Sequence, residues 1–384
     1  MNNFSFHNPT KIVFGEGQIS ALADLVPNNA RILLTYGGGS IKTNGVYDQV
    51  IAALNGKVYF EFSGIEPNPH YETLMKATAL VKEKKLDFIL AVGGGSVIDG
   101  SKLIAAAAHF EGEPWDILEK HAPVTSALPL GCVLTLPATG TESNGNSVVT
   151  KAATQQKLAF GSPLVYPQFA VLDPTTTYTL PPRQIANGVV DAYVHIMEQY
   201  LTYPVNAKVQ DRFAEGLLLT LIEEGPKALA NPKDYEVRSN VMWAATMALN
   251  GLIGVGVPQD WATHMIGHEL TAMHGLDHAQ TLAIVLPSVM NQQRQQKRGK
   301  LIQYGQRVWG LNNANEDELI DAAIAATKNF FEQMGVPTTF KGYGLDGSSI
   351  PQLVEKVITH NPNPLGEHSD ITAEVTRKIL QAAA

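Results

Sequence analysis

The sequence predicts an α/β domain followed by an all-helical domain. In the first half, short runs of β-branched and apolar residues alternate with amphipathic helical stretches, a pattern typical of a parallel sheet with helices on both faces. After Gln184 the strand signal almost disappears, and long runs with helical apolar periodicity follow. The sequence pattern changes from alternating strands and helices to helices alone near Pro181-Pro182, so we expect one domain over residues 1–180 and a second over residues 181–384.

The expected strands of the first half are rich in β-branched, apolar and aromatic residues. They are Arg31–Tyr36, Val58–Phe62, Phe88–Val92 and Cys132–Leu136. Helical patterns between them cover Tyr71–Lys85 and Ser96–Phe110. The second half offers long helical runs such as Asp211–Gly225, Glu236–Ile253 and Glu318–Gly335. We expect the polar, low-complexity segment at residues 291–300 to be a solvated helix face or its loop.

Composition and charge favour a cytoplasmic enzyme with a small-molecule substrate. The 384 residues are 45% hydrophobic, which is enough to bury a sizeable core, and the formal net charge of −8 argues against binding to nucleic acid or anionic membranes. Cys132 is the only cysteine, so a scaffold built on disulfides is excluded. The segment Met1–Lys11 shows no signal-peptide pattern, and no apolar run is long enough to span a bilayer.

A histidine-rich block over Trp261–His278 is the most distinctive feature of the second half. Its four histidines form two pairs spaced by four residues: His264, His268, His274 and His278. Gly275 is expected to end one helix and allow the next to begin. Upstream, Asp191 and His195 form another pair with the same spacing. Such pairs lie on one helix face, and carboxylate and imidazole groups together suit Zn²⁺ or Fe²⁺. Spacing alone does not select which of the four histidines bind.

Three glycine-containing loops follow expected strands of the first half. Two read GGGS, at Gly37–Ser40 and Gly93–Ser96, and the third contains Thr139, Gly140, Thr141 and Ser143. Glycines allow close approach of an anion, and a following helix offers backbone N–H groups and its dipole. The G-x-G-x-x-G fingerprint is absent. Because all three loops would lie at the carboxyl ends of parallel strands, we expect them to bind a nucleotide.

Together these motifs resemble the iron-containing (group III) metal-dependent alcohol dehydrogenases, especially the NADPH-dependent aldehyde reductase and butanol dehydrogenase branch. The resemblance extends over essentially the whole chain. It is carried by the segments FHNPTKIVFGEG, IEPNP, GGGSVIDGSK, TLPATGTESN, VLDPTTTYTLPP, DAYVH and HMIGHELTAMHGLDHA. The glycine loops alone would not be specific, whereas the histidine block with its upstream Asp-x-x-x-His is.

The resemblance implies a dehydroquinate-synthase-like fold, in which a Rossmann-like nucleotide-binding domain precedes a helical metal-binding domain and the active site lies between them. It implies four metal ligands: Asp191, His195, His264 and His278. His268 would lie near the nicotinamide ring and is a candidate to relay a proton. The remaining expected cofactor contacts are Gly94, Gly95, Ser96, Asp99, Thr135, Thr139, Thr141, Asn144, Lys157, Leu180 and His274. The resemblance also implies a homodimer.

The first glycine loop favours NADPH over NADH. NAD-dependent members of the family carry an aspartate just after this first strand, where it binds the ribose hydroxyls. Here no acid occurs between Arg31 and Tyr47. The loop residues Gly37, Gly38, Gly39 and Ser40, with Lys42 nearby, suit the oxygens of a 2′-phosphate.

Two positions depart from the family pattern. Many members carry Gly-Thr-Gly-Ser-Glu where this chain has Gly140 to Asn144, so the final acid is an amide here and its contacts to nicotinamide or substrate differ. The helix after the second glycine loop has Gly100-Ser101 before Lys102, in place of the usual x-Ala, which replaces one small residue with another.

We therefore expect NADPH-dependent interconversion of aldehydes and primary alcohols, with one divalent metal, Fe²⁺ or Zn²⁺, polarising the carbonyl oxygen. A lyase or phosphosugar dehydrogenase of the same fold would need basic residues where the segment around Trp261 and Met265 is apolar. A metallohydrolase would need H-E-x-x-H, but Ala272 replaces the second histidine after His268-Glu269. A non-catalytic metal-binding module is the remaining alternative, and ligands that leave a position open argue against it.

Overall fold

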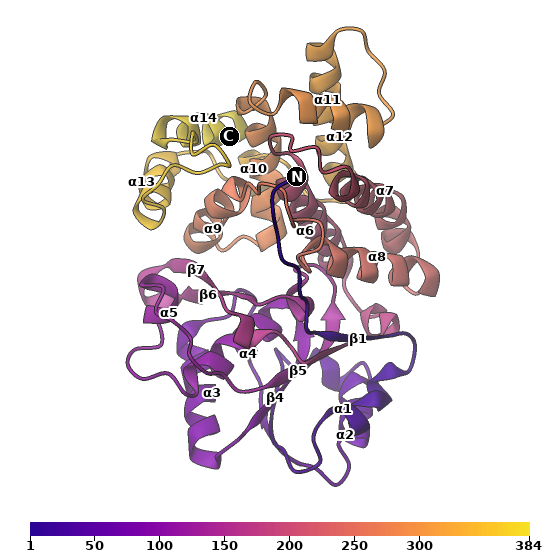
Figure 1. The fold of residues 1–384 in the computed structure, drawn as a ribbon, viewed down its shortest axis with the longest axis vertical. Helices are drawn as coiled ribbons and strands as arrows, with labels where there is room; N and C mark the ends of the chain where they lie inside the picture. Colours follow the sequence, from indigo (N-terminus) through magenta and orange to yellow (C-terminus); the bar gives the residue numbers. More distant parts are fainter. The chain divides into compact units, whose positions relative to one another are not determined.

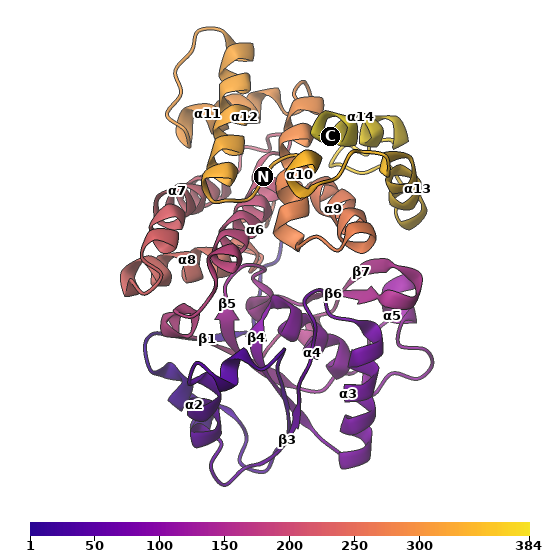
Figure 2. The same ribbon diagram turned by 180° about the vertical axis from the view of Figure 1, so that it is seen from behind.

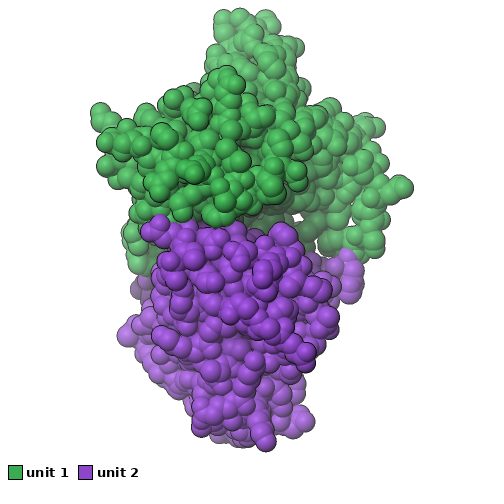
Figure 3. All heavy atoms as spheres, turned by 90° about the vertical axis from the view of Figure 1, so that its left-hand side faces the viewer, with its two compact units in different colours: residues 1–6, 181–230, 247–384 green, residues 7–180, 231–246 purple.

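The computed structural model describes all 384 residues, which divide into two compact units. Unit 1 comprises residues 1–6, 181–230 and 247–384, and unit 2 comprises residues 7–180 and 231–246 (Figure 3). Unit 2 is α/β, whereas unit 1 is helical, so the predicted fold class is confirmed. No helix combines the length and the apolar character needed to cross a membrane.

Unit 2 is built on a six-stranded, fully parallel sheet in the order β1-β8-β5-β4-β2-β3 (Figure 1). Its strands are β1 (Lys11–Phe14), β2 (Arg31–Thr35), β3 (Val58–Phe62), β4 (Phe88–Gly94), β5 (Leu130–Leu136) and β8 (Phe169–Leu172). The four strands expected from the sequence are all present. The structure adds β1 and β8, together with a separate antiparallel hairpin of β6 (Asn146–Lys151) and β7 (Gln156–Gly161).

Successive side chains of β4 point to opposite faces of the sheet, as the pleat of a strand requires. Ile89 and Ala91 join one buried cluster, and Leu90 and Val92 join another. Helices of unit 2 contribute to these clusters: α3 (Tyr71–Lys84), α4 (Gly95–Ala107) and α5 (Asp116–Glu119) to the first, and α1 (Leu22–Leu25) and α2 (Val46–Ala53) to the second. Both faces of the sheet are therefore covered by helices.

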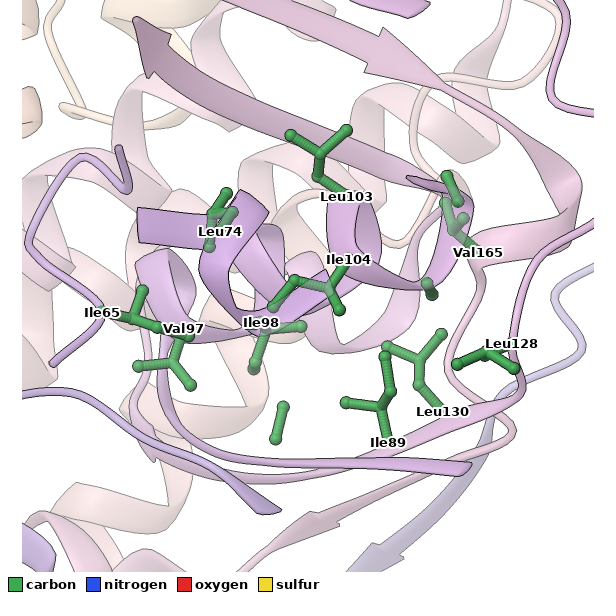
Figure 4. Close-up of a cluster of buried hydrophobic side chains, with 14 of the residues drawn as sticks. Ile65, Leu74, Ile89, Val97, Ile98, Leu103, Ile104, Leu128, Leu130 and Val165 are labelled. Carbon is green, nitrogen blue, oxygen red and sulfur yellow. The ribbon is translucent and has the colours of Figure 1, made fainter. Parts of the chain in front are cut away.

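Figure 4 shows the first of these clusters. Ile89 of β4 and Leu130 of β5 lie next to Ile98 and Ile104, which project from α4. Helix α4 is buried along almost its whole length, which explains its run of small and apolar residues. Because α4 begins directly at the end of β4, this packing fixes the position of the second glycine loop.

Unit 1 is a bundle of helices (Figures 1 and 2). They are α6 (Pro182–Tyr200), α7 (Lys208–Ala230), α9 (Ala262–His274), α10 (His278–Gln292), α11 (Arg298–Arg307), α12 (Glu316–Gln333), α13 (Ile350–His360) and α14 (Ala373–Ala383). Helix α6 packs against α7 and α10, and α10 packs also against α9 and α14. Helix α8 (Tyr235–Ala248) lies mainly in unit 2.

The expectation that residues 291–300 are solvated is wrong for two of its lysines. Lys297 and Lys300 are both buried. The Lys297 ammonium lies 2.8 Å from Asp260 and 2.7 Å from Glu367, and Lys300 pairs with Asp211. These carboxylates come from distant parts of the chain, so local sequence composition did not reveal them.

Candidate functional site

Helix α6 carries Asp191 and His195 in the interior of unit 1. The helix has Pro182 in its first turn, where the missing N–H has no intrahelical partner to lose. Every residue from Gly188 to Tyr200 is buried, and Asp191 and His195 are each only 3% exposed. Their spacing places both side chains on one face, one turn apart. A carboxylate at this depth requires a positive charge or several donors around it.

Helices α9 and α10 supply the two other histidines. His264 lies in the first turn of α9, and His278 is the first residue of α10. Gly275 ends α9 with a φ of 68°, a conformation that glycine adopts without a Cβ penalty. Asp277 then caps α10 through a reciprocal capping box with Gln280. This short connection places His278 beside α9.

Potential ligand atoms from α6, α9 and α10 converge in one place. The carboxylate and imidazole atoms of four residues lie within 4.8 Å of one another: Asp191, His195, His264 and His278. Nε2 of His278 lies 3.6 Å from Oδ1 of Asp191, and Nε2 of His195 lies 3.9 Å from it. Both separations exceed hydrogen-bond length. Two ligands of an ion with bonds of about 2.1 Å would stand roughly 3.4 Å apart, so the four atoms would draw together by up to about 1.4 Å around a bound ion.

The chemistry of this donor set suits a divalent transition metal. Three imidazoles and one carboxylate are borderline donors that Zn²⁺ and Fe²⁺ both accept. Asp191 supplies one negative charge, which would leave a bound dication with a net charge near +1. An ion bound there would retain its electrophilic character.

Glu198 is a residue of this site that the sequence analysis missed. It lies one turn beyond His195 on α6 and is 4% exposed. One carboxylate oxygen contacts Nδ1 of His264, and the other accepts the backbone N–H of His264 at 3.2 Å. Burial, together with the nearby Asp260, raises the pKa of the Glu198 carboxyl well above its usual range, so its charged form requires positive partners. The spacing Asp191, His195, Glu198 along one helix face was the available signal.

The structure separates the two remaining histidines of the block. His268 is 5% exposed, and its ring centroid lies 5.4 Å from that of His278 and 6.2 Å from that of His264. His274 is instead partly exposed at the end of α9, where its Nε2 lies 2.9 Å from the Ser349 hydroxyl. Burial lowers the pKa of His274. His268 therefore adjoins the ligand cluster, and His274 does not.

In unit 2, the expected cofactor loops gather at one edge of the sheet. The segments Gly37–Ser40 and Thr139–Ser143 follow β2 and β5, and Gly93–Ser96 spans the end of β4 and the start of α4; these three strands are neighbours in the sheet and run parallel. The chain passes from β2 outward to β3, then returns to β4 on the other side of β2. This reversal between β2 and β4 is where open α/β sheets bind nucleotides.

The glycines of the second loop are also required by packing. A Cβ added at Gly94 would lie 2.9 Å from Leu136, and one at Gly95 would lie 2.6 Å from the Thr139 hydroxyl. Glycine at these two positions therefore allows the end of β4 to lie close against Leu136 and Thr139. Ser96 accepts a hydrogen bond from the backbone N–H of Asn68 at 3.1 Å.

A buried lysine organises the third loop. The Lys102 ammonium is fully buried and donates to the Thr141 hydroxyl at 2.7 Å, the Asn144 side chain at 3.1 Å and the Asn146 carbonyl at 2.7 Å. Asp99 accepts from the Thr141 hydroxyl and from the backbone of Val148. Burial lowers the pKa of Lys102 to about 8. The side chains of Asp99, Thr141 and Asn144 thus point into the loop and shape it.

The other expected cofactor residues lie as follows. Thr135, Thr139 and Leu180 are partly exposed. Lys157 is 5% exposed, and its ammonium lies 2.9 Å from the side-chain oxygen of Asn68. Asn68 therefore links the β6–β7 hairpin to the second glycine loop.

An acid that the sequence analysis did not consider lies beside the first glycine loop. Glu61 of β3 stands opposite Leu34 of β2 and accepts hydrogen bonds from Lys42 at 2.9 Å and from the hydroxyls of Tyr36 and Tyr47. Burial opposes ionisation, but these three donors outweigh it and lower the pKa of Glu61 to about 2. Lys42 is thus held near the loop with part of its charge neutralised.

Unit 1 also contains a cavity of about 680 Å³. It is lined by α7, α11 and residues 199–207, including Lys208, Asp211, Arg212 and Lys300. None of the four converging ligand residues lines it.

Comparison with known families assigns both halves of the chain to one group. The model of the family "Iron-containing alcohol dehydrogenase" matches residues 9–174, and that of its C-terminal domain matches residues 185–384. The chain is 64% identical to the NADPH-dependent aldehyde reductase YqhD of Escherichia coli, with all of both chains covered. It is 40% identical to a probable NADH-dependent butanol dehydrogenase of Bacillus subtilis, again over all of both chains.

Solved structures show the same fold. The crystal structure of Escherichia coli YqhD superimposes with a TM-score of 0.99 at 63% identity, covering 100% of this chain and 99% of that one. The NADH-dependent butanol dehydrogenase A of Thermotoga maritima gives a TM-score of 0.96 at 38% identity, with 100% and 99% covered.

Proposed function

The chain belongs to the iron-containing alcohol dehydrogenase family, and we propose that it reduces aldehydes to primary alcohols with NADPH and one bound divalent metal. The observation that carries the proposal is the convergence of one carboxylate and three imidazoles within 4.8 Å in the interior of unit 1. The identity of 64% to an NADPH-dependent aldehyde reductase supports the reaction and its cofactor.

We propose that the metal, Fe²⁺ or Zn²⁺, is held by Asp191, His195, His264 and His278. When bound, the metal supplies a Lewis acid for the carbonyl oxygen of the aldehyde. Asp191 anchors the ion by charge, while the three neutral imidazoles keep its net charge positive. Asp191, His195 and His264 are buried and His278 is partly exposed, and burial strengthens the electrostatic interactions of the three buried groups.

NADPH is proposed to bind at the carboxyl edge of β2, β4 and β5. When bound, its nicotinamide supplies the hydride. The loop Gly37–Ser40 would receive the 2′-phosphate, with Lys42 beside it. The second glycine loop and the start of α4 would receive the pyrophosphate, since the first N–H groups of a helix favour anions. In this assignment residues 1–180 form the nucleotide-binding domain, and residues 181–384 form the metal-binding domain.

Several residues would act on the cofactor indirectly. Asp99, Thr141 and Asn144 hold the shape of the third loop through Lys102, leaving Thr135, Thr139 and the backbone of the loop to contact the cofactor. The remaining expected contacts, Lys157, Leu180 and His274, are proposals of the same kind.

The alkoxide formed by hydride addition must take up a proton. His268 is the proposed donor, because it is buried beside His278 and an imidazole N–H can act as a general acid.

We further propose a cytoplasmic homodimer. The lone Cys132 is buried, so no disulfide contributes to stability. Two large apolar side chains of α7, Val209 and Phe213, are 54% and 45% exposed one turn apart. Exposed apolar groups at this spacing suit an interface between copies of the chain.

The test is the oxidation of NADPH by the purified protein in the presence of butanal, followed by absorbance. Metal-free protein should be inactive, and activity should return when Fe²⁺ or Zn²⁺ is added. Elemental analysis of protein purified under argon identifies which ion is bound. Failure of every added metal to restore NADPH oxidation with any aldehyde would contradict the proposed reaction.

A further inference from the structure

The Glu198 carboxylate contacts both the backbone and the ring of His264. One carboxylate oxygen accepts the backbone N–H of His264 at 3.2 Å, and the other contacts Nδ1 of its ring. Both groups are buried, with Glu198 4% and His264 6% exposed. Contacts to both the backbone N–H and the ring Nδ1 restrict rotation of the His264 side chain.

The position of Glu198 follows from the geometry of α6. Asp191, His195 and Glu198 occupy three successive turns of one helix face. The first two reach the converging ligand atoms, whereas the third reaches the far side of the His264 ring. An imidazole has two nitrogens, so a carboxylate at Nδ1 leaves Nε2 as the nitrogen that can bind a metal.

We propose that Glu198 is a positioning residue that locks His264 as an Nδ1-protonated imidazole with Nε2 directed at the metal. Carboxylates that accept the second N–H of a ligating histidine fix its tautomer and increase its basicity. The assignment rests on the proposed metal site.

A second set of contacts fixes Glu198 and the start of α9. The Glu198 carbonyl accepts the backbone N–H of Asp260 at 2.9 Å, and one oxygen of Asp260 accepts the N–H of Ala262 at 2.8 Å. The other oxygen of Asp260 lies 2.8 Å from Lys297, which also binds Glu367 at 2.7 Å. Glu367 therefore belongs to the same buried cluster, which it joins through Lys297.

This arrangement supplies a matched control. Glu198→Ala removes both contacts to His264. Glu198→Gln keeps the size but retains only one acceptor atom, so one of the two contacts is lost. Glu367→Gln changes a buried carboxylate of the same cluster and leaves both contacts between Glu198 and His264 in place.

The experiment measures the dissociation constant of Zn²⁺ for each full-length, metal-stripped protein by competition with a chromophoric chelator. Circular dichroism reports whether each variant is folded, and the visible spectrum of the Co²⁺-loaded protein reports the ligand field. We expect Glu198→Ala to weaken Zn²⁺ binding by about tenfold to a hundredfold. We expect Glu198→Gln to weaken it at least about threefold and to change the Co²⁺ spectrum, with Glu367→Gln within about twofold of the parent and spectrally unchanged.

Parent-like Zn²⁺ affinity and Co²⁺ spectrum in folded Glu198→Gln would overturn the role of Glu198, even where Glu198→Ala does not fold. An equal loss of affinity in Glu367→Gln would also overturn it, since the effect would then come from the cluster as a whole. If the parent binds no Zn²⁺, the proposed metal site itself fails, and the role of Glu198 fails with it.

Discussion

Replacing Gly38 with aspartate tests the proposed preference for NADPH. Gly38 lies in the loop Gly37–Ser40 after β2 and is exposed. A Cβ at this position meets no atom within 4 Å, and its φ lies outside the left-handed range. Gly39 has a φ of +96°, where any side chain would be strained. Gly38 is therefore the position at which a carboxylate can be introduced without deforming the loop.

The expected effect can be worked from the charges involved. A parent preference for NADPH of at least about tenfold corresponds to about 1.4 kcal/mol in transition-state binding. A carboxylate roughly 5 Å from a phosphate of about −1.75 charges is repelled by about 1.5 kcal/mol in water, and by about 3 kcal/mol if the loop halves the effective dielectric constant. The new carboxylate also accepts hydrogen bonds from the ribose hydroxyls of NADH. Gly38→Asp should therefore reduce the preference by about tenfold to a hundredfold, erasing or reversing it.

The assay compares kcat/KM for NADPH and NADH with butanal, at one fixed ionic strength because salt screens the repulsion. Gly38→Asn is the matched control, since it has nearly the same size and no charge. It should stay within about threefold of the parent preference. Equal use of both cofactors by the parent, or an equal shift in Gly38→Asn, would refute the electrostatic reasoning.

Three further predictions concern the metal and the first loop. His264→Ala or His278→Ala should abolish both metal content and aldehyde reduction. His274 lies beside Ser349 and outside the cluster of four ligand residues, so His274→Ala should keep most of its metal by elemental analysis. Full metal content in His264→Ala would contradict the ligand assignment. A chelator should lower Tm by roughly 3 °C or more, because metal binding stabilises the folded state by mass action, and an unchanged Tm after verified metal loss would argue against a buried site. Glu61→Gln should lower Tm near pH 6, because the depressed folded-state pKa of Glu61 means that its ionised form stabilises the fold. The Tm difference between parent and variant should shrink as the pH falls from 4.5 toward about 2, where this stabilisation is lost. A Tm difference that stays constant with pH would refute the prediction.

Local periodicity and residue type were enough to predict four strands of the sheet and several of the long helices. The strand Val58–Phe62 agrees with its prediction at both ends, and the helix Tyr71–Lys84 differs by one residue. The helix shows a period because one of its faces is buried, whereas the strand was recognised from its β-branched and aromatic residues. The four-residue strands β1 and β8 and the polar hairpin β6–β7 were missed. Their strand character depends on pairing partners that are distant in sequence, or on contacts that composition does not reveal.

The sequence alone also determined the chemistry available to the site. The pairs Asp191 with His195 and His264 with His268 each lie on one helix face at a spacing of four, which predicts metal-binding groups before any fold is known. Spacing could not say which histidines join Asp191, because periodicity within one helix carries no information about its neighbours. The resemblance supplied that choice as an expectation.

Only the tertiary structure decided which groups meet. It brings His278 to 3.6 Å from Asp191, leaves His274 at the far end of α9, and places Glu198 behind His264. It likewise pairs Lys42 with Glu61 and buries Lys297 between carboxylates from two separate segments, Asp260 and Glu367. Contacts of this kind join residues that are tens to hundreds of positions apart, and they arise from the packing of whole helices and strands. Local sequence determines which face an element presents, and packing determines what that face touches.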